Sequence, residues 1–385
     1  MQFRVISIGA SASHALWNER EAVRTGHATT TLIQSGDRTI LVDPGLPAGM
    51  ADEALASLRR AGLSPTLFDG LKSDPTTAQA DAGADLARGI GARAVVALGG
   101  GSAMDVGKAV AVIAPGSAPA DAYALCAIPF PAGALPCVCV PTTSGTGSET
   151  TRTAVLTDPE GRKIWLWGDA MKPAVVVLDP LLTLGLPPHL TAATGIDALV
   201  HAMEAATSSR AHPLSDVSCH AAITLVVRHL EAAVANGQDR TARAALQRAA
   251  ALAGIGIDAA GTSVGHMIGH AMGSLRPIHH GRAVGLAVLA TLPWSVVAED
   301  DGPFAAVARA MGEAPQAARV PAAFERLLRA TGIRVSIAEE FAGIDAATLA
   351  AQMARPENAP MRQSSRRRVD DVDLGRFAQT VLTQT

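Results

Sequence analysis

The stretch from Thr194 to Gly281 constrains the fold most, because it carries two histidine-containing pairs at the spacing of a helical turn. Asp197 and His201 are four residues apart, and residues at positions i and i+4 project from the same face of an α-helix. Further along the chain, His266 and His270 repeat this spacing. The pattern therefore predicts two helices whose polar faces point toward one another.

Several side chains in this stretch are candidate ligands of a divalent metal. One carboxylate and three imidazoles from two facing helices would close a mononuclear site. Such a mixed nitrogen and oxygen set suits Fe(II), Zn(II), Mn(II) or Co(II) better than Ca(II) or Cu(I). A single histidine on a helix face has an ordinary structural explanation, but two compact clusters favour a metal site. The candidates are Asp197, His201, His266, His270, His279 and His280.

Upstream of this stretch, apolar runs rich in β-branched residues alternate with segments of helical periodicity. The run Arg38–Gly45 is the first predicted strand of this series, and it ends in Asp43 and a turn. Further strand-like runs occupy residues 65–70, 92–100, 137–145 and 174–180. This alternation predicts a parallel sheet that is covered by helices on both faces.

After residues 184–188 (LGLPP) the sequence changes to long, alanine-rich amphipathic segments. We therefore expect a domain boundary at Leu184–Leu190. Residues 1–184 are predicted to form a dinucleotide-binding α/β domain with a Rossmann-like parallel sheet, and residues 185–385 an all-α domain. The predicted helices of the second domain are Ala192–Thr207, Pro213–Ala235, Thr241–Asp258, Thr262–Met272, Gly285–Val297, Pro303–Met311 and Pro321–Gly332.

Composition excludes several classes of function. Aromatic residues make up 3% of the chain and the net charge is -3, which argues against a base-stacking or basic nucleic-acid surface. The four cysteines fit neither a zinc knuckle nor a disulfide framework. The opening MQFRVISIGA lacks the pattern of a secretory signal, and the apolar run at residues 284–297 is short and broken by Pro293. We expect a soluble, cytoplasmic protein that binds neither nucleic acid nor membrane.

Two turns that follow predicted strands favour nucleotide binding. The first contains three consecutive glycines, Gly99, Gly100 and Gly101, before a helix start with Ser102 and Asp105. Glycines let the backbone approach a ligand closely, and the N–H groups and dipole of a helix N-terminus favour a phosphate. The spacing matches neither a Walker A loop nor GxGxxG, so a purely structural tight turn is the alternative.

The second turn, Thr142–Thr151, has seven hydroxyl residues and two glycines. In open parallel sheets, ligands bind beyond the carboxyl ends of the strands, where both turns fall. Asp43, at the end of its own strand, is placed to accept hydrogen bonds from an adenosine ribose. A carboxylate there would repel a 2′-phosphate and favour NAD(H) over NADP(H). A plain turn-forming role is the alternative for Asp43.

Together and in this order, the motifs of the chain resemble those of the iron-containing (group III) alcohol dehydrogenases. They are GGGSAMDVGK, PTTSGTGSE, LDP followed by LPP, TGIDALVHAMEA, and GHMIGHAMG followed by HHG. The resemblance extends from about Thr39 to the C-terminus. It implies an N-terminal dinucleotide-binding α/β domain, a C-terminal helical domain, and a metal and a nicotinamide in the cleft between them.

The resemblance assigns the metal ligands. The family's last ligand directly precedes a glycine, which favours His280, before Gly281, over His279. His270 matches a non-ligand histidine beside the nicotinamide and the substrate. Fe(II) is the expected ion and Zn(II) the alternative. The four matching ligands are Asp197, His201, His266 and His280.

The resemblance also assigns the cofactor contacts. Lys163 matches a lysine near the nicotinamide ribose, Asp74 matches a polar contact, and Asp43 matches the ribose-binding acid. The matching pyrophosphate turn consists of Gly99, Gly100, Gly101, Ser102 and Ala103, and the matching hydroxyls are those of Thr142, Thr143 and Thr146.

The first forty residues depart from the family's usual opening. The stretch at residues 26–47 resembles instead the opening hairpin of metallo-β-lactamase-fold hydrolases. That fold also needs an HxHxDH motif, which this sequence lacks, so a hydrolase site is not supported. We expect the segment to supply an edge hairpin to the sheet.

The resemblance implies reversible hydride transfer between NAD(H) and a small primary alcohol or aldehyde, with the metal as Lewis acid and His270 as proton relay. Arg276 and His279 could recognise an acid-bearing substrate, or could be solvent-facing loop residues. The alternative function is a non-redox metal and NAD enzyme similar to dehydroquinate synthases. The resemblance also suggests a homodimer or larger homo-oligomer, in which an edge strand at residues 1–10 could pair across a two-fold axis.

Overall fold

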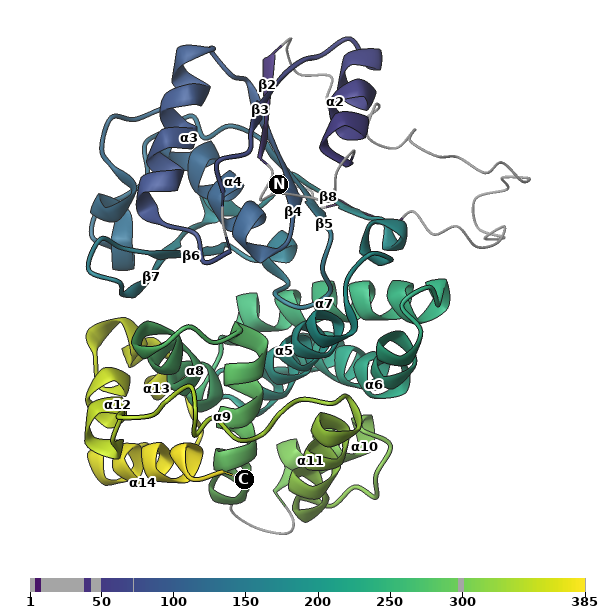
Figure 1. The fold of residues 1–385 in the computed structure, drawn as a ribbon, viewed down its shortest axis with the longest axis vertical. Helices are drawn as coiled ribbons and strands as arrows, with labels where there is room; N and C mark the ends of the chain where they lie inside the picture. Colours follow the sequence, from purple (N-terminus) through teal and green to yellow (C-terminus); the bar gives the residue numbers. More distant parts are fainter. Residues whose placement is uncertain (1–3, 8–37, 43–49, 72, 297–300, 385) are drawn as a thin grey trace. The chain divides into compact units, whose positions relative to one another are not determined.

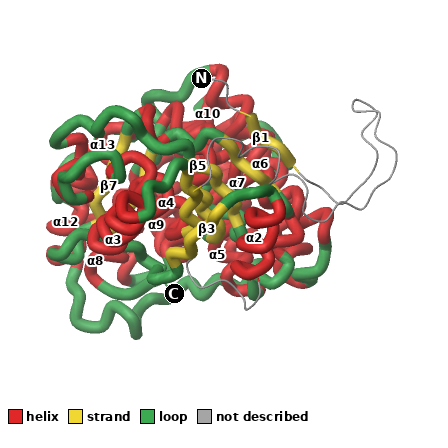
Figure 2. Tube along the Cα trace, turned by 90° about the horizontal axis from the view of Figure 1, so that it is seen from above, coloured by secondary structure: helices red, strands yellow, loops and turns green. Residues whose placement is uncertain are grey.

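The computed structural model describes residues 4–7, 38–42, 50–71, 73–296 and 301–384. The chain divides into two compact units. Unit 1 comprises Met1–Thr143 and Ser148–Thr183, and unit 2 comprises Ser144–Gly147 and Leu184–Thr385. The described strands belong to unit 1, whereas the regular elements described in unit 2 are helices (Figures 1 and 2).

Unit 1 is built on a six-stranded sheet with the order β1-β8-β5-β4-β2-β3, and every pairing in it is parallel. The predicted parallel sheet is therefore confirmed. Its strands are β1 (Arg4–Ser7), β2 (Arg38–Val42), β3 (Ser64–Phe68), β4 (Ala94–Gly99), β5 (Cys137–Pro141) and β8 (Val175–Leu178).

The N-terminal strands occupy two different places in the sheet. β1 lies at one edge, where it pairs with β8. β2 lies between β3 and β4 and is parallel to both. The expectation that the segment before residue 45 adds an edge hairpin is thus wrong for β2, which is an interior strand.

Helices cover both faces of the sheet, and β4 shows why. Successive side chains of a strand point to opposite faces. Val95 and Ala97 belong to one apolar cluster, whereas Val96 and Leu98 belong to another. A strand that is buried on both sides reads as a continuous apolar run, as β4 does. The first cluster contains residues of α3 (Thr77–Gly89) and α4 (Gly101–Ile113), and the second contains residues of α2 (Met50–Arg60).

A small antiparallel sheet of two strands, β6 (Thr153–Thr157) and β7 (Lys163–Trp167), was not predicted from the sequence. Both strands alternate buried and partly exposed residues, with buried Ala154 and Leu156 opposite buried Ile164 and Leu166. β7 begins at Lys163, which is one of the predicted cofactor contacts.

Unit 2 is helical, as predicted for the second half of the chain. α9 begins at His280 rather than at Gly285, so this histidine is the first residue of a helix. The segment after Gly332, for which no helix was predicted, contains α12 to α14. The helices are α5 (Pro188–Thr207), α6 (Pro213–Ala235), α7 (Arg240–Ala260), α8 (Val264–Leu275), α9 (His280–Ser295), α10 (Gly302–Ala310), α11 (Val320–Ala330), α12 (Ala346–Met353), α13 (Ala359–Ser364) and α14 (Asp371–Leu382). Short 3-10 turns occupy Ala120–Cys126, Ser148–Thr150, Asp169–Met171, Pro180–Thr183, Ala317–Arg319 and Pro356–Asn358.

Small residues let the helices of unit 2 pack closely. A Cβ atom on Gly195 of α5 would lie 2.3 Å from the Leu230 side chain of α6, and one on Gly269 of α8 would lie 2.6 Å from the Val284 side chain of α9. A larger residue at either position would force the neighbouring side chain or helix to shift. These glycines therefore allow the close approach of α5 to α6 and of α8 to α9.

One described helix, α6, is long and apolar enough to cross a membrane. Its apolar residues Cys219, Ile223, Val226 and Leu230 are buried in the core of unit 2. Packing against α5 and α7 thus buries one apolar face of this helix.

Candidate functional site

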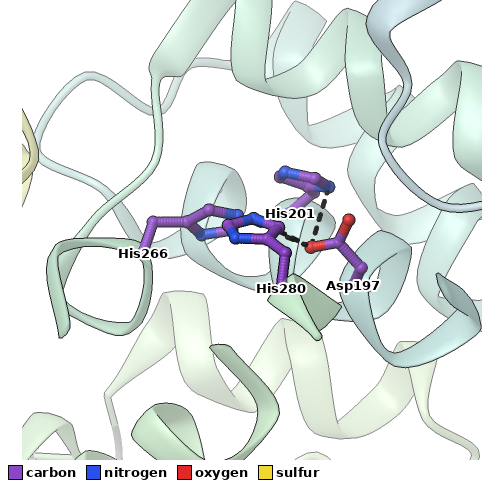
Figure 3. A group of neighbouring side chains, drawn as sticks. All are labelled: Asp197, His201, His266 and His280. Atoms are coloured by element: carbon purple, nitrogen blue, oxygen red, sulfur yellow. Dashed lines mark ion pairs between the residues drawn. The ribbon is translucent and has the colours of Figure 1, made fainter. Parts of the chain in front are cut away.

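Three helices of unit 2 bring one carboxylate and three imidazoles to a single point. Asp197 and His201 lie on the same face of α5, His266 lies in the first turn of α8, and His280 begins α9. The Oδ1 atom of Asp197 is 3.9 Å from Nδ1 of His201, 3.8 Å from Nε2 of His266 and 3.6 Å from Nε2 of His280. The four side chains point toward one another (Figure 3).

These four side chains form a donor set that fits a divalent metal. Each offers one ligand atom, and the four atoms lie within 4.8 Å of one another. Within the described part of the chain, Oδ1 of Asp197, Nδ1 of His201 and Nε2 of His266 are buried without a hydrogen-bond partner. A buried polar atom without a partner is costly. A metal ion coordinated by these atoms would remove that cost.

The electrostatics of the group favour neutral imidazoles. Burial lowers the pKa of His266 well below its ordinary value of 6.5, and the neighbouring His201 acts in the same direction. The side chain of His280 is 42% exposed; burial of the remainder lowers its pKa, and the Asp197 carboxylate opposes this effect. Metal ligation requires neutral imidazole nitrogens, so this environment prepares the histidines for it.

Two of the six candidate ligands lie beside the group of four. The ring of His270 is 5.4 Å from that of His280 and 6.3 Å from that of His266, measured between centroids. His279 is the exposed N-cap of α9. Burial lowers the pKa of His279, and the Asp197 carboxylate opposes the change. The structure therefore places both histidines near the centre but outside its closest cluster.

Sequence reasoning missed one buried acid beside the centre. Glu204 lies on α5, and its Oε2 atom is 2.7 Å from Nδ1 of His266. Burial raises the pKa of Glu204 to about 7, while hydrogen bonds from backbone N–H groups act in the opposite direction. Glu204 follows Asp197 by seven residues and His201 by three, which places all three on one helix face. That periodicity could have identified it.

In unit 1, the glycine turn and the start of the hydroxyl-rich loop lie side by side. Gly99 ends β4 with a φ of 148°, and its carbonyl oxygen accepts a hydrogen bond of 2.9 Å from the N–H of Thr142. A Cβ atom on Gly100 would lie 3.3 Å from the Thr143 side chain. Gly100 is the N-cap of α4 and makes no side-chain cap, which leaves first-turn N–H groups for an anion.

The carboxylate of Asp105 is engaged inside unit 1. It accepts hydrogen bonds from Oγ of Ser148 at 2.5 Å and from the N–H of Val155 at 3.0 Å, and Nζ of Lys108 lies 3.6 Å away. Burial raises the pKa of Asp105, and Lys108 opposes this shift. These contacts tie α4 to the hydroxyl-rich loop and to β6. A cofactor contact of Asp105 remains a prediction.

The other predicted cofactor residues fall in different places. Ser102 and Ala103 lie in the first turn of α4. Thr146 belongs to the segment Ser144–Gly147, which is part of unit 2. Asp43 lies outside the described residues.

Asp74 and Lys163 form a second polar group in unit 1. The two side chains make an ion pair, and Oγ1 of Thr157 contacts both, at 3.0 Å from Oδ1 of Asp74 and 2.9 Å from Nζ of Lys163. Asp74 has a φ of 68°, a left-handed conformation that asparagine and aspartate tolerate best among non-glycine residues. Burial lowers the pKa of Lys163 to about 8, whereas the ion pair favours its charged form.

Two family models together match most of the chain. The model of the iron-containing alcohol dehydrogenases matches residues 22–180, and the model of the C-terminal region of the Fe-containing alcohol dehydrogenase family matches residues 191–373. The first match begins before Thr39 and includes the whole stretch at residues 26–47 that resembles a metallo-β-lactamase-fold opening.

Similar proteins act on different small molecules. The choline dehydrogenase of Bacillus subtilis (strain 168) is 35% identical over 64% of this chain and 62% of its own length. The 1,3-propanediol dehydrogenase of Citrobacter freundii is 37% identical over 72% of this chain and 73% of its own length. A solved structure of sulfoacetaldehyde reductase from Bifidobacterium kashiwanohense in complex with NAD+ aligns with a TM-score of 0.80 and 28% identity, covering 91% of this chain and 92% of that one. The chain thus spans less than two thirds of the choline dehydrogenase.

Proposed function

Because the chain belongs to the iron-containing alcohol dehydrogenase family, we propose that it catalyses reversible hydride transfer between NAD(H) and a small primary alcohol or aldehyde. The observation that carries this proposal is the convergence of one carboxylate and three imidazoles from three helices, with unpartnered buried donor atoms. A purely structural histidine cluster would satisfy these atoms with hydrogen bonds.

Asp197, His201, His266 and His280 would hold the divalent ion, Fe(II) or Zn(II). An ion bound there supplies Lewis-acid polarisation of a substrate oxygen. The Asp197 carboxylate contributes the negative charge of the site, and burial of three of the four side chains keeps water from competing for their ligand atoms. The exposure of the His280 side chain supports an approach of the substrate from that side.

The cofactor would be held by residues of both glycine-containing turns. Gly99, Gly100 and Gly101 let the backbone approach a pyrophosphate, and the first-turn N–H groups of α4 at Ser102 and Ala103 can donate to it. Bound NAD(H) supplies or accepts the hydride. The further contacts proposed for it are Thr142, Thr143, Thr146, Asp105, Asp74, Lys163 and the ribose-binding acid Asp43. The NAD+ in the similar sulfoacetaldehyde reductase supports the choice of cofactor.

His270 is the group we propose to move the proton of the alcohol. Its ring lies 5.4 Å from the ring of His280, and its side chain is partly exposed. An imidazole titrates near neutral pH, so a ring nitrogen there can accept a proton from the substrate side and release it to solvent.

The similar proteins have substrates that share a short chain ending in an alcohol or aldehyde, but their charges differ. Choline carries a cation, 1,3-propanediol is neutral and sulfoacetaldehyde carries a sulfonate. We therefore include in the proposal a substrate that carries an acidic group, which Arg276 and His279 would recognise. A cytoplasmic homodimer or larger homo-oligomer also belongs to it, supported by the edge position of β1.

The test joins metal analysis to an activity panel. We expect one equivalent of Fe(II) or Zn(II) per chain and stoichiometric NADH formation with small primary alcohols. His266→Ala should lose both the metal and the activity, whereas His229→Ala, on α6, should keep both. Full activity of His266→Ala in the presence of added Fe(II) or Zn(II) would contradict the proposal. Turnover without net NADH would indicate instead the non-redox chemistry of a dehydroquinate-synthase-like enzyme.

A further inference from the structure

Glu204 of α5 is buried against the start of α8, and both of its carboxylate oxygens have hydrogen-bond partners there. Its Oε2 atom accepts a hydrogen bond of 2.8 Å from the N–H of Ser263 and lies 2.7 Å from Nδ1 of His266. Its Oε1 atom accepts a hydrogen bond of 2.5 Å from the N–H of Gly265. The side chain is 9% exposed. All of its close partners are therefore groups of α8 and of the residue before it.

The chemistry of these donors fixes the proton on His266. A backbone N–H can only donate, so Ser263 and Gly265 require Glu204 to act as an acceptor at both oxygens. If both oxygens of Glu204 act as acceptors, the contact with His266 is made only when Nδ1 carries the hydrogen. The other nitrogen, Nε2, is left with its lone pair. That atom lies 3.8 Å from Oδ1 of Asp197 and has no hydrogen-bond partner among the described residues.

The same carboxylate also caps the N-terminus of α8. Ser263 is the N-cap of this helix, but its side chain makes no capping hydrogen bond. Glu204 of α5 instead accepts the N–H of Gly265, which such a cap could satisfy, and the N–H of Ser263 itself. A Cβ atom on Gly265 would lie 2.9 Å from Oε1 of Glu204, so a glycine is needed for this approach. One side chain thus sets both where α8 starts and which nitrogen of His266 faces the centre.

We propose that Glu204 is a positioning residue of the metal centre: it holds His266 in the Nδ1–H form and aims Nε2 at the ion. The inference rests on the metal part of the proposed function. Carboxylates that orient a ligating histidine through its second nitrogen commonly change metal affinity by about 10–100-fold when removed.

The first experiment titrates the metal-free protein with Co(II) at pH 8 and follows the visible absorption of the bound ion. Glu204→Gln has nearly the same shape, but a carboxamide has only one accepting oxygen. It must either leave a backbone N–H without a partner or donate its own N–H to His266 and move the imidazole proton to Nε2. We expect about 10–100-fold weaker Co(II) binding and an altered spectrum.

The matched control is Glu357→Gln, which changes another buried glutamate of unit 2 that lies 3.8 Å from Arg355. It should bind Co(II) like the wild type. Glu204→Gln with an affinity within about threefold of the wild type and an unchanged spectrum would overturn the proposal, because the expected loss is at least about tenfold.

A second measurement needs no variant and covers the case in which Glu204→Gln fails to fold. The ¹⁵N chemical shifts of His266 in metal-free wild-type protein at pH 8 report which nitrogen carries the hydrogen. The proposal requires the Nδ1–H form, and the Nε2–H form would overturn it. If the wild type itself binds no Co(II), the proposed function fails; if wild type and Glu204→Gln bind it equally, only the role of Glu204 fails.

Discussion

Gly281 lies directly against the backbone of Ala193: a Cβ atom on the glycine would be 2.0 Å from the Ala193 carbonyl oxygen. The same atom would be 3.1 Å from Cβ of Asp197. Because His280 directly precedes Gly281, this contact between α9 and α5 holds Nε2 of His280 at 3.6 Å from Oδ1 of Asp197. The glycine therefore helps to shape the candidate metal centre without donating a ligand atom.

Gly281→Ala should lower the affinity for a metal ion and should also lower the free energy of unfolding. The added methyl group forces α9 away from α5, and overpacking of this kind costs about 1–3 kcal/mol of the free energy of unfolding. Co(II) affinity should fall because His280 moves with the helix. The control is Gly273→Ala in α8, where a Cβ atom would meet nothing within 4 Å. That change should be neutral or stabilising by up to about 1 kcal/mol. Equal Co(II) binding by both variants would contradict a role of Gly281.

Lys108→Met should loosen the hydroxyl-rich loop. Lys108 is fully buried, and its Nζ atom donates to the carbonyl oxygen of Ser148 at 2.8 Å and to Oγ1 of Thr151 at 3.1 Å. Its loss also leaves the Asp105 carboxylate without its cation. Breaking one side of a buried pair costs about 3–5 kcal/mol. We expect this loss in urea unfolding, together with weaker NADH binding measured by fluorescence.

Lys172→Met is the control for this variant, because Nζ of Lys172 makes a hydrogen bond of 2.8 Å to the carbonyl oxygen of Thr150 in the same loop. It is only partly buried, so its loss should cost no more than about 1.5 kcal/mol. If Lys108→Met proved no less stable than Lys172→Met, Lys108 would not be the anchor of the loop.

The metal centre was the part of the site most open to prediction from the sequence. The i, i+4 spacing of Asp197 and His201 is local, so a single helix suffices to bring them together. The partners on α8 and α9 depend on helix packing, which spacing does not encode. Spacing alone could not choose between His279 and His280; the family resemblance favoured His280, and the structure places it in the cluster.

The fold shows the same division between local and long-range information. The parallel sheet was predictable because strand and helix patterns alternate along the chain. The pairing of β6 and β7 was not, since these consecutive strands pair antiparallel in a separate sheet, without a helix between them. Nor could sequence alone show that Asp105 is engaged by Ser148, because their hydrogen bond joins residues 43 positions apart. The resemblance to iron-containing alcohol dehydrogenases is confirmed by two family models.

Glu149→Gln should change how stability depends on pH. Burial raises the pKa of Glu149 from 4.5 to about 7. Between these values the folded protein keeps a proton that the unfolded chain has released. The raised pKa of Glu149 therefore contributes to the free energy of unfolding. This contribution is fully present below pH 4.5 and is lost as pH rises through 7. Glutamine stays neutral at every pH. The free energy of unfolding of the variant, relative to that of the wild type, should therefore rise by up to about 3 kcal/mol between pH 5 and pH 8.

The measurement is thermal unfolding of the metal-free protein at both pH values. Glu160→Gln changes an exposed glutamate and should follow the wild type. A difference between Glu149→Gln and the wild type that stays constant from pH 5 to pH 8 would show that Glu149 is ionised in the folded protein throughout.

Lys163→Met should weaken NADH binding and flatten its pH dependence. Lys163 is held by Asp74 and Thr157, and burial lowers its pKa to about 8. A lysine loses its charge as pH rises through its pKa, so wild-type affinity for NADH should fall between pH 7 and pH 9. Methionine has no charge to lose. At pH 7 we expect the dissociation constant to rise about tenfold, which corresponds to about 1.4 kcal/mol.

The control is Arg93→Met, which removes one positive charge from an exposed position of unit 1. It should keep both the affinity and the pH dependence of the wild type, because an exposed charge away from the ligand is screened by salt. The dissociation constants of both variants are measured by NADH fluorescence at pH 7 and pH 9. They show whether Lys163 acts through a direct contact with NADH or only through the net charge of the protein. If Lys163→Met bound NADH as tightly as Arg93→Met at pH 7, Lys163 would not contact the cofactor.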